Sequence, residues 1–273
     1  MRSRLNVLMV MVFAAGCAWQ GAVKIPDSVP ELRPGILQGY LAPEMLPDSF
    51  ALLPPPPAEG SAALALDREM SEKALALQGS PRFDLAAADA VLRFPDAVGT
   101  FACAIGVPIT EQDTPNLYML LRRSLTDAGL STYAAKNRYQ RTRPFVVNGQ
   151  PTCTPQEEAM LSNDGSYPSG HSALGWAWAL ILAELVPDRS DAILARGRAF
   201  SESRVICNVH WYSDVEEGRF MGSAAVARLH GDPVFRAQVD KAREEVEKLR
   251  VAGAVPVGDC EAEAKALKGI GLR

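Results

Sequence analysis

The stretch from Ala173 to Val186 is the longest apolar segment of the chain, and it constrains the fold more than any other feature. It is shorter than the ~20 residues of a membrane-spanning helix, and it carries Glu184. We therefore predict a buried central helix. The segment follows the turn Tyr167-Pro168-Ser169-Gly170-His171, so the unpaired amides and the positive dipole end of the helix would meet a glycine-containing loop. A helix that begins in this way favours an anion.

Helical patterns extend over most of the remaining sequence. The expected helices run from a cap at Ser61 to Gly79, from Phe83 to about Phe94, from the pair Thr114-Pro115 to Gly129, and from Asp232 to Ala252. No series of alternating strand patterns with hairpin turns is visible. The sequence predicts one all-α domain, a single helical bundle over residues 61–252. A proline-rich extended segment (21–60) precedes it, and a C-terminal tail (253–273) follows it.

The first twenty residues have the layout of a bacterial export signal, with Arg2 and Arg4 ahead of an apolar run. Residues 1–20 are therefore left out of the fold prediction. The stretch Ala14-Ala15-Gly16-Cys17 resembles a lipoprotein signal, but Ala14 stands where that pattern usually has leucine. Lipidation of Cys17 and ordinary cleavage both stay open. We expect a periplasmic or secreted protein with no transmembrane helix in the mature chain, either free or anchored to a membrane through Cys17.

Export would place the four remaining cysteines in an oxidising compartment, where two disulfides are expected. Four cysteines allow three connectivities, and the sequence alone does not choose among them. The pairing that we favour joins Cys153 to Cys207 and Cys103 to Cys260. Removal of Arg2 and Arg4 from the 28 basic residues leaves 26 against 32 acidic ones, a net charge near −6. This charge argues against nucleic acid as a bulk partner, so an anion site needs a local concentration of cations.

The sequence contains three clusters of residues that could bind a ligand or catalyse a reaction, and the first consists of Lys136 and the pair Arg143-Pro144. In one continuous helix, seven residues are close to two turns, which would leave both cations on the same face. Pro144 would then end that helix. Arg138 and Arg141, in the same stretch, are interpreted as part of a solvated basic face.

The second cluster is Pro168-Ser169-Gly170-His171, and the third is Ser203-Arg204 with His210 and Asp214. His210 and Asp214 are four residues apart, so on a helix the carboxylate could bind one ring nitrogen and leave the other free. Arg204 and His210 are six apart and would point about 120° away from each other on an unbroken helix. We therefore predict a helix break near Cys207-Asn208.

Together the clusters resemble the signature of the bacterial class A acid phosphatases, which belong to the phosphatidic acid phosphatase type 2 (PAP2) superfamily. Every specified position of that signature is filled: Lys136, Arg143, Pro144, Pro168, Ser169, Gly170, His171, Ser203, Arg204, His210 and Asp214. The resemblance extends over residues 52–61, 165–167 and 203–207, and covers about residues 40 to 250. It implies an all-helical fold of the acid phosphatase and vanadium-dependent haloperoxidase type.

The resemblance implies hydrolysis of small-molecule phosphate monoesters without a metal or other cofactor. Lys136, Arg143 and Arg204 would bind the nonbridging phosphoryl oxygens. The hydroxyl of Ser169 and the backbone N–H of Gly170 would complete the site. Broad substrate range, transfer of phosphate to alcohols, inhibition by phosphate or vanadate, and association into a homo-oligomer are further expectations.

The same resemblance gives roles to the second and third clusters. His210, oriented by Asp214, would attack phosphorus and become phosphohistidine. His171 would protonate the leaving oxygen and then activate water as a base. The third histidine of the chain, His230, is expected to cap a helix C-terminus. A histidine-rich metal centre would therefore have to use His171 and His210.

Three alternatives remain. The vanadium-dependent haloperoxidases share the signature, but they are usually much longer than this chain. A noncatalytic phosphate-binding protein would keep a complete nucleophile and acid without using them. The membrane lipid phosphatases of the superfamily need several spanning helices, which this sequence lacks after its signal.

Overall fold

The computed structural model describes residues 23–268, so the predicted export signal and Cys17 lie outside the described residues. The long helices of this region are α2 (Ala62–Leu75), α3 (Pro81–Asp89), α5 (Pro115–Leu130), α9 (Gly170–Leu185), α10 (Ser190–Ile206), α11 (Tyr212–Leu229), α12 (Pro233–Val251) and α13 (Cys260–Leu267). The short helical elements are η1 (Pro43–Met45), α1 (Ser49–Leu52), η2 (Asp96–Phe101), α4 (Ala102–Ile105), α6 (Tyr133–Tyr139), α7 (Pro144–Asn148), η3 (Pro155–Glu157), α8 (Glu158–Leu161) and η4 (Pro187–Arg189). The all-α prediction is confirmed.

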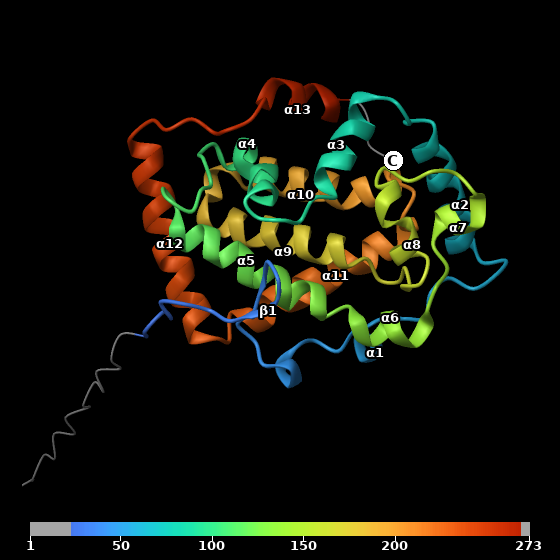
Figure 1. Cartoon of the computed structure of the whole chain (residues 1–273), viewed down its shortest axis with the longest axis horizontal. Helices are drawn as coiled ribbons and strands as arrows, with labels where there is room; N and C mark the ends of the chain where they lie inside the picture. The colour runs from blue at the N-terminus through green and yellow to red at the C-terminus, as the bar shows by residue number, and fades with distance from the viewer. Residues whose placement is uncertain (1–22, 269–273) are drawn as a thin grey trace, which may run out of the picture.

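The apolar helix α9 lies at the centre, in contact with α5, α10 and α11 (Figure 1). Most of its buried apolar side chains belong to the main hydrophobic core, where Trp178 contacts Phe101 edge-on and donates a hydrogen bond to the carbonyl of Leu121 at 3.0 Å. Close approach of α11 requires glycine at position 218, where a Cβ atom would lie 2.5 Å from the carbonyl oxygen of Ser169. The central-helix prediction is confirmed, and α11 is pressed against the N-terminal end of α9.

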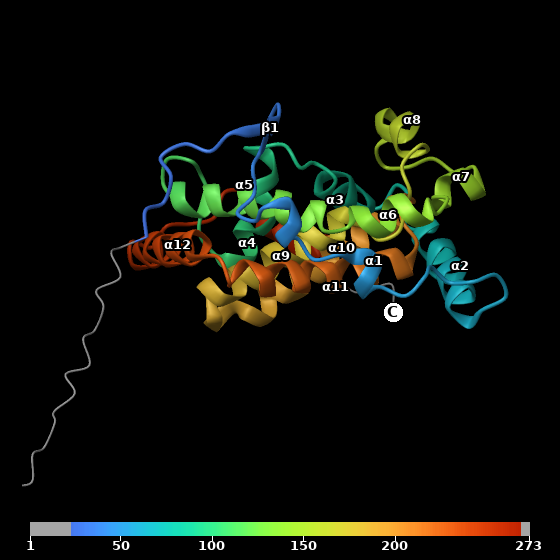
Figure 2. The same ribbon diagram turned by 90° about the horizontal axis from the view of Figure 1, so that it is seen from below.

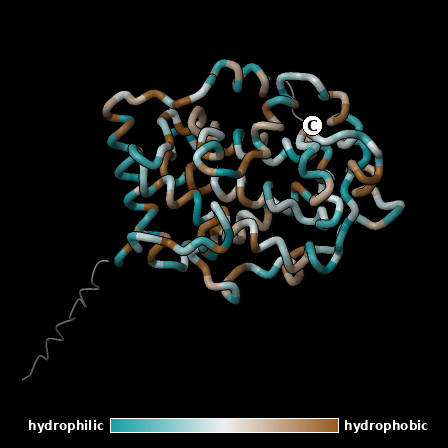
Figure 3. The backbone as a smooth tube through the Cα atoms, viewed as in Figure 1, coloured by the Kyte–Doolittle hydropathy of each residue, from teal (hydrophilic) through white to brown (hydrophobic). Residues whose placement is uncertain are grey.

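Other predicted helices are present with shifted ends. Ser61 caps α2 by accepting the amide of Leu64 at 3.2 Å, but the helix ends at Leu75 rather than at Gly79. Helix α3 begins at Pro81 and ends at Asp89, before the predicted Phe94. Helix α12 has the predicted bounds, and its buried residues recur at helical spacing along one face. Accordingly, its trace alternates between hydrophobic and hydrophilic stretches (Figure 3).

Helix α5 begins at the predicted Pro115, but Thr114 does not cap it with its side chain. The carboxylate of Glu245, on α12, instead accepts the amides of Asn116 and Leu117 at 3.0 Å each. A residue 129 positions along the chain thus supplies the negative charge that a helix N-terminus favours. This contact also attaches α12 to α5.

The flanking segments contain more structure than the sequence suggested. Within residues 21–60, strands β1 (Glu31–Arg33) and β2 (Ile36–Leu37) form a small antiparallel hairpin around Gly35, whose φ of 80° suits a tight turn. The predicted tail contains α13, which contacts α3. Disulfides join Cys103 to Cys260 and Cys153 to Cys207, the pairing that we favoured. Across residues 23–268, no helix combines the length and the apolar character needed to cross a membrane.

Seen from below, α6, α7 and α8 gather at the end of the molecule where α9 begins (Figure 2). The predicted site residues lie on α6, at the starts of α7, α9 and α11, and in the last turn of α10. The fold thus brings the three sequence clusters to one end of a rigid helical core.

Candidate active site

The start of α9 is fixed by hydrogen bonds to its own first turn and to α11. Ser169 is the N-cap residue, and its hydroxyl accepts the amide of Ser172 at 3.2 Å. The amide of Ser169 donates to the carbonyl of Asp214 at 2.9 Å. Gly170 follows with an ordinary backbone, and a Cβ atom there would meet only the hydroxyl of Thr132, at 3.5 Å. The fold therefore does not require glycine at position 170. Close approach of a ligand to the backbone N–H of this residue would require it.

Lys136 and Arg143 converge although they do not share a helix, so that part of the sequence interpretation was wrong. Helix α6 ends at Tyr139 because Gln140 takes a left-handed conformation with φ of 44°. Pro144 does not end a helix but begins α7, where a proline without an N–H is well accommodated. The turn between the helices brings Nζ of Lys136 to 2.6 Å and Nη2 of Arg143 to 3.3 Å from the carbonyl oxygen of Gly165.

Arg143 is 2% exposed and is held by several backbone carbonyls. Its Nε donates to the carbonyls of Leu161 and Asp164 at 2.9 Å each, and its Nη1 donates to that of Val209 at 3.0 Å. Nη2 also lies 3.1 Å from the carboxylate of Asp164, which is 3.7 Å from Nζ of Lys136. The guanidinium therefore has a fixed orientation, with one acidic neighbour that the sequence gave no reason to select.

Arg204 lies in the last turn of α10 and is 1% exposed. Its Nε and Nη1 atoms are buried without a hydrogen-bond partner among residues 23–268. The predicted break follows at Asn208, whose φ is 60°, and the amides of Val209 and His210 both fold back onto the carbonyl of Arg204 at 3.2 Å. A buried cation with unpaired donors destabilises the folded protein unless an anion accepts their hydrogen bonds. Arg204 is therefore suited to bind a phosphate ligand.

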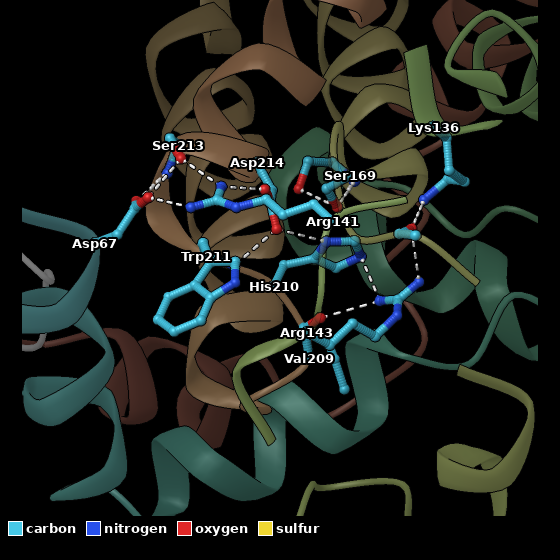
Figure 4. Close-up of polar contacts among 12 residues, drawn as sticks. Asp67, Lys136, Arg141, Arg143, Ser169, Val209, His210, Trp211, Ser213 and Asp214 are labelled. Carbon is cyan, nitrogen blue, oxygen red and sulfur yellow. Dashed lines mark hydrogen bonds and ion pairs between the residues drawn. The ribbon is translucent and has the colours of Figure 1, made fainter. Parts of the chain in front are cut away.

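His210 lies directly before the N-cap of α11, and Asp214 lies in the first turn of that helix (Figure 4). The carboxylate of Asp214 reaches back to the amide of Trp211 at 2.9 Å and to Nδ1 of His210 at 3.3 Å. Nε2 of His210 lies 3.1 Å from Nη1 of Arg143. Because a guanidinium can only donate, Nε2 is the unprotonated nitrogen and Nδ1–H donates to Asp214.

The interpretation of Arg141 as part of a solvated face was wrong. Its Nη1 donates to the carboxylate of Asp214 at 2.6 Å and to the hydroxyl of Ser213 at 2.8 Å, while its Nη2 donates to Asp67 at 2.7 Å (Figure 4). Asp67, on α2, is buried and also accepts the amide of Ser213 at 2.7 Å. Arg138, by contrast, is exposed. Nothing in the local sequence separates the two arginines, and only the path of the chain after Gln140 does so.

His171 is in the first turn of α9, where its Nε2 lies 3.2 Å from the carbonyl oxygen of Ala90. Since a carbonyl only accepts, Nε2 carries the proton of the neutral ring and Nδ1 is the nitrogen that titrates. Burial, and then the charge of Arg204, lower the pKa of His171 well below its usual value. His230, the third histidine, is the C-cap residue of α11 as predicted, away from these contacts.

The electrostatics of the site are dominated by crowded cations. Burial, and then the charge of Arg143, lower the pKa of Lys136 to about 8 and that of Arg204 to about 10. The pKa of His210 is also lowered well below its usual value, by burial and then by the charges of Arg143 and Lys136. An anion bound among these groups would relieve their mutual repulsion. In the described part of the chain, no group of three or more His, Cys, Asp or Glu side chains is arranged to hold a metal ion.

A family model described as the PAP2 superfamily matches residues 117–236, which contain all the predicted site residues. A non-specific acid phosphatase of Providencia stuartii is 46% identical over 212 residues, which are 77% of this chain and 86% of the relative. The chain belongs to the PAP2 superfamily. An acid phosphatase of Zymomonas mobilis is 42% identical over 77% of this chain and 79% of the relative. A non-specific acid phosphatase of Salmonella typhimurium is 41% identical over 77% of this chain and 84% of the relative.

These relatives place the chain among the acid phosphatases of the PAP2 superfamily, as the sequence resemblance implied. The helical architecture agrees with that family. The chain is thus an enzyme of the acid phosphatase type.

Proposed function

We propose that this PAP2 enzyme hydrolyses phosphate monoesters through a covalent phosphohistidine on His210. The observation that carries the proposal is the position of the His210 ring between Asp214 and Arg143. Nδ1 lies 3.3 Å from the carboxylate, and Nε2 lies 3.1 Å from the guanidinium. A phosphoryl acceptor needs an unprotonated nitrogen next to a cation that can bind a phosphoryl oxygen. Nε2 of His210 and the guanidinium of Arg143 have this arrangement.

The substrate's phosphoryl group would bind among Lys136, Arg143 and Arg204. Their positive charges, together with the Ser169 hydroxyl and the Gly170 N–H, would stabilise the negative oxygens in the transition state. The helix N-terminus at Gly170 adds its partial charge. The unpaired Nε and Nη1 atoms of Arg204 support this role.

In the first step, Nε2 of His210 attacks phosphorus, and the bond from phosphorus to the leaving oxygen breaks. His171 donates its proton to that oxygen, so an alcohol leaves and an N–P bond forms. In the second step, water attacks phosphorus while His171 accepts its proton, and the N–P bond breaks to release phosphate. An alcohol in place of water would give a new phosphate ester, so phosphotransferase activity follows from the same intermediate.

The site is suited to work in acid. The lowered pKa of His210, caused first by burial and then by Arg143, keeps the nucleophile unprotonated at low pH. His171 needs a proton for the first step, and its pKa is also lowered in the free enzyme. A bound phosphate dianion would raise the pKa of His171, because the negative charge favours the imidazolium form. Substrate binding would thus supply the acid that the reaction requires.

Rapid quench with substrate labelled in its phosphoryl group tests the intermediate. We expect label on the wild-type protein, stable in alkali and lost in acid as for a phosphoramidate, and none on His210→Ala. Asp214→Asn, which weakens the orienting contact, should form the labelled protein more slowly. Label retained by His210→Ala, or label on a serine, would disprove the mechanism.

The remaining expectations have separate assays. We propose a broad range of small monoesters, competitive inhibition by phosphate or vanadate, and a periplasmic or secreted location, with lipidation at Cys17 decided by mass spectrometry of the mature N-terminus. Bromide oxidation in the presence of vanadate and peroxide, faster than hydrolysis of an aryl phosphate, would favour the haloperoxidase alternative.

A further inference from the structure

The carboxylate of Asp164 lies on the cations of the phosphoryl site. One of its oxygens, Oδ2, is 3.1 Å from Nη2 of Arg143 and 3.7 Å from Nζ of Lys136. No other carboxylate among residues 23–268 forms an ion pair with either side chain. Asp214, the acidic member of the proposed catalytic set, accepts hydrogen bonds from Arg141 and Trp211 and lies beside Nδ1 of His210.

The two partners differ sharply in exposure. The side chains of Lys136 and Arg143 are 4% and 2% exposed, whereas that of Asp164 is 36% exposed. The cations are therefore fixed in the protein, and the carboxylate covers them from the solvent side. Asp164 lies in the loop between α8 and α9, where its carbonyl accepts Nε of Arg143 at 2.9 Å and its amide donates to the carbonyl of Leu161 at 3.2 Å.

We propose that Asp164 is an internal competitor for the phosphoryl site and limits the affinity of this enzyme for phosphate. The inference rests on the proposed function, because it takes Lys136 and Arg143 as phosphate ligands. A phosphate anion that reaches the same nitrogen atoms meets the negative charge of Asp164 within a few ångströms. The carboxylate must either move into solvent or repel the anion. In both cases the ground-state complex and the product complex are weakened.

The physical advantage is release of product. Three buried cations without a counter-charge would hold inorganic phosphate tightly, and slow release would limit turnover. Asp164 provides a replacement ligand for Lys136 and Arg143 as phosphate leaves. It also offsets the repulsion between these two cations in the free enzyme, since its charge raises the pKa of both side chains against the dominant effect of burial.

The test is isothermal titration calorimetry with inorganic phosphate at pH 6, where Lys136, with a pKa of about 8, is protonated. Asp164→Asn keeps the shape of the side chain and removes the charge. We expect the variant to bind phosphate about tenfold more tightly, which is the effect of removing a close, partly exposed like charge from beside the anion. The matched control is Asp240→Asn, which removes the same charge from an exposed position on α12. It should bind phosphate like wild type.

Equal or weaker binding of phosphate by Asp164→Asn would overturn the inference and make Asp164 a structural support for the two cations. Lys136→Ala separates this result from a failure of the proposed function. If Lys136→Ala binds phosphate as wild type does, the cations are not the phosphate site. If Lys136→Ala loses binding while Asp164→Asn gains none, only the role of Asp164 is wrong. Asp164→Ser, measured by the rise in Tm that phosphate causes, provides the same comparison if Asp164→Asn does not fold.

Discussion

Replacement of Arg141 by lysine should damage catalysis from a position that does not contact the proposed phosphate site. The guanidinium donates to Asp214 at 2.6 Å through Nη1 and to Asp67 at 2.7 Å through Nη2. Lysine keeps the charge but has a single nitrogen, so it cannot reproduce this two-pronged contact. Loss of one charge-assisted hydrogen bond costs about 1.5–3 kcal/mol. If the orientation of His210 is lost to that extent in the transition state, kcat falls about 10- to 150-fold.

The KM of Arg141→Lys should change little, because Arg141 makes no hydrogen bond to Lys136, Arg143 or Arg204 among the described residues. A stability loss of about 1.5–3 kcal/mol would lower Tm by about 3–12 °C in a chain of this size. Steady-state kinetics with an aryl phosphate, well below the lower Tm, would therefore separate catalysis from folding.

Arg138→Lys is the matched control for Arg141→Lys, because Arg138 is an exposed arginine three residues away in the sequence. It should keep the wild-type kcat and Tm. A wild-type kcat in Arg141→Lys, with only the Tm reduced, would refute the positioning role and leave Arg141 as a structural ion pair.

Four further predictions concern pH, two glycines and metals. The kcat/KM value should fall as pH rises through the lowered pKa of His171 in the free enzyme. The fall in kcat should come at higher pH, because the bound phosphate group favours the protonated ring. Coincident pH profiles of kcat/KM and kcat would contradict this assignment. Gly170→Ala should keep the wild-type Tm but raise KM about tenfold by blocking an anion contact. Gly218→Ala, whose Cβ would lie 2.5 Å from the carbonyl of Ser169, should lose about 1–3 kcal/mol of stability, measured by urea unfolding. Activity should survive a strong chelator, because three fixed cations supply the charge that a metal would; loss that zinc or magnesium restores would defeat that reasoning.

The central helix and the helix break could be predicted because each depends on local sequence. The apolar run of α9 can be buried in few ways, and one straight helix would point Arg204 and His210, six residues apart, about 120° away from each other. The break at Asn208 follows from that spacing and from a residue type that tolerates positive φ. The motif likewise located the cations and the histidines in the sequence before their contacts were known.

The wrong predictions concern features that depend on distant parts of the chain. A spacing of seven suggested one helix for Lys136 and Arg143, and the left-handed Gln140 that separates them carries no strong local signal. Arg141 is partly buried because it binds Asp67 and Asp214, which lie 74 residues before it and 73 residues after it. The N-terminus of α5 is capped by Glu245, more than a hundred residues away. Such contacts are set by packing of the bundle, which local periodicity does not encode.

The acidic side chains around the site fall into two groups with separate partners. Asp67 and Asp214 bind Arg141, and Asp214 also contacts Nδ1 of His210, whereas Asp164 binds Lys136 and Arg143. Substitutions without shared partners act additively. In the double variant Arg141→Lys with Asp164→Asn, the dissociation constant for phosphate should therefore follow the Asp164 change, and kcat should follow the Arg141 change.

The two groups meet at one contact, between Nη1 of Arg143 and Nε2 of His210 at 3.1 Å. If that contact transmits a movement of Arg143 to the nucleophile, the double variant will deviate from additivity in kcat while phosphate binding stays additive. A deviation in phosphate binding instead would mean that Arg141 helps to place the cations. Because Arg143 is the one residue that contacts both Asp164 and His210 among the described side chains, this double-variant comparison tests whether affinity and reactivity can be tuned independently.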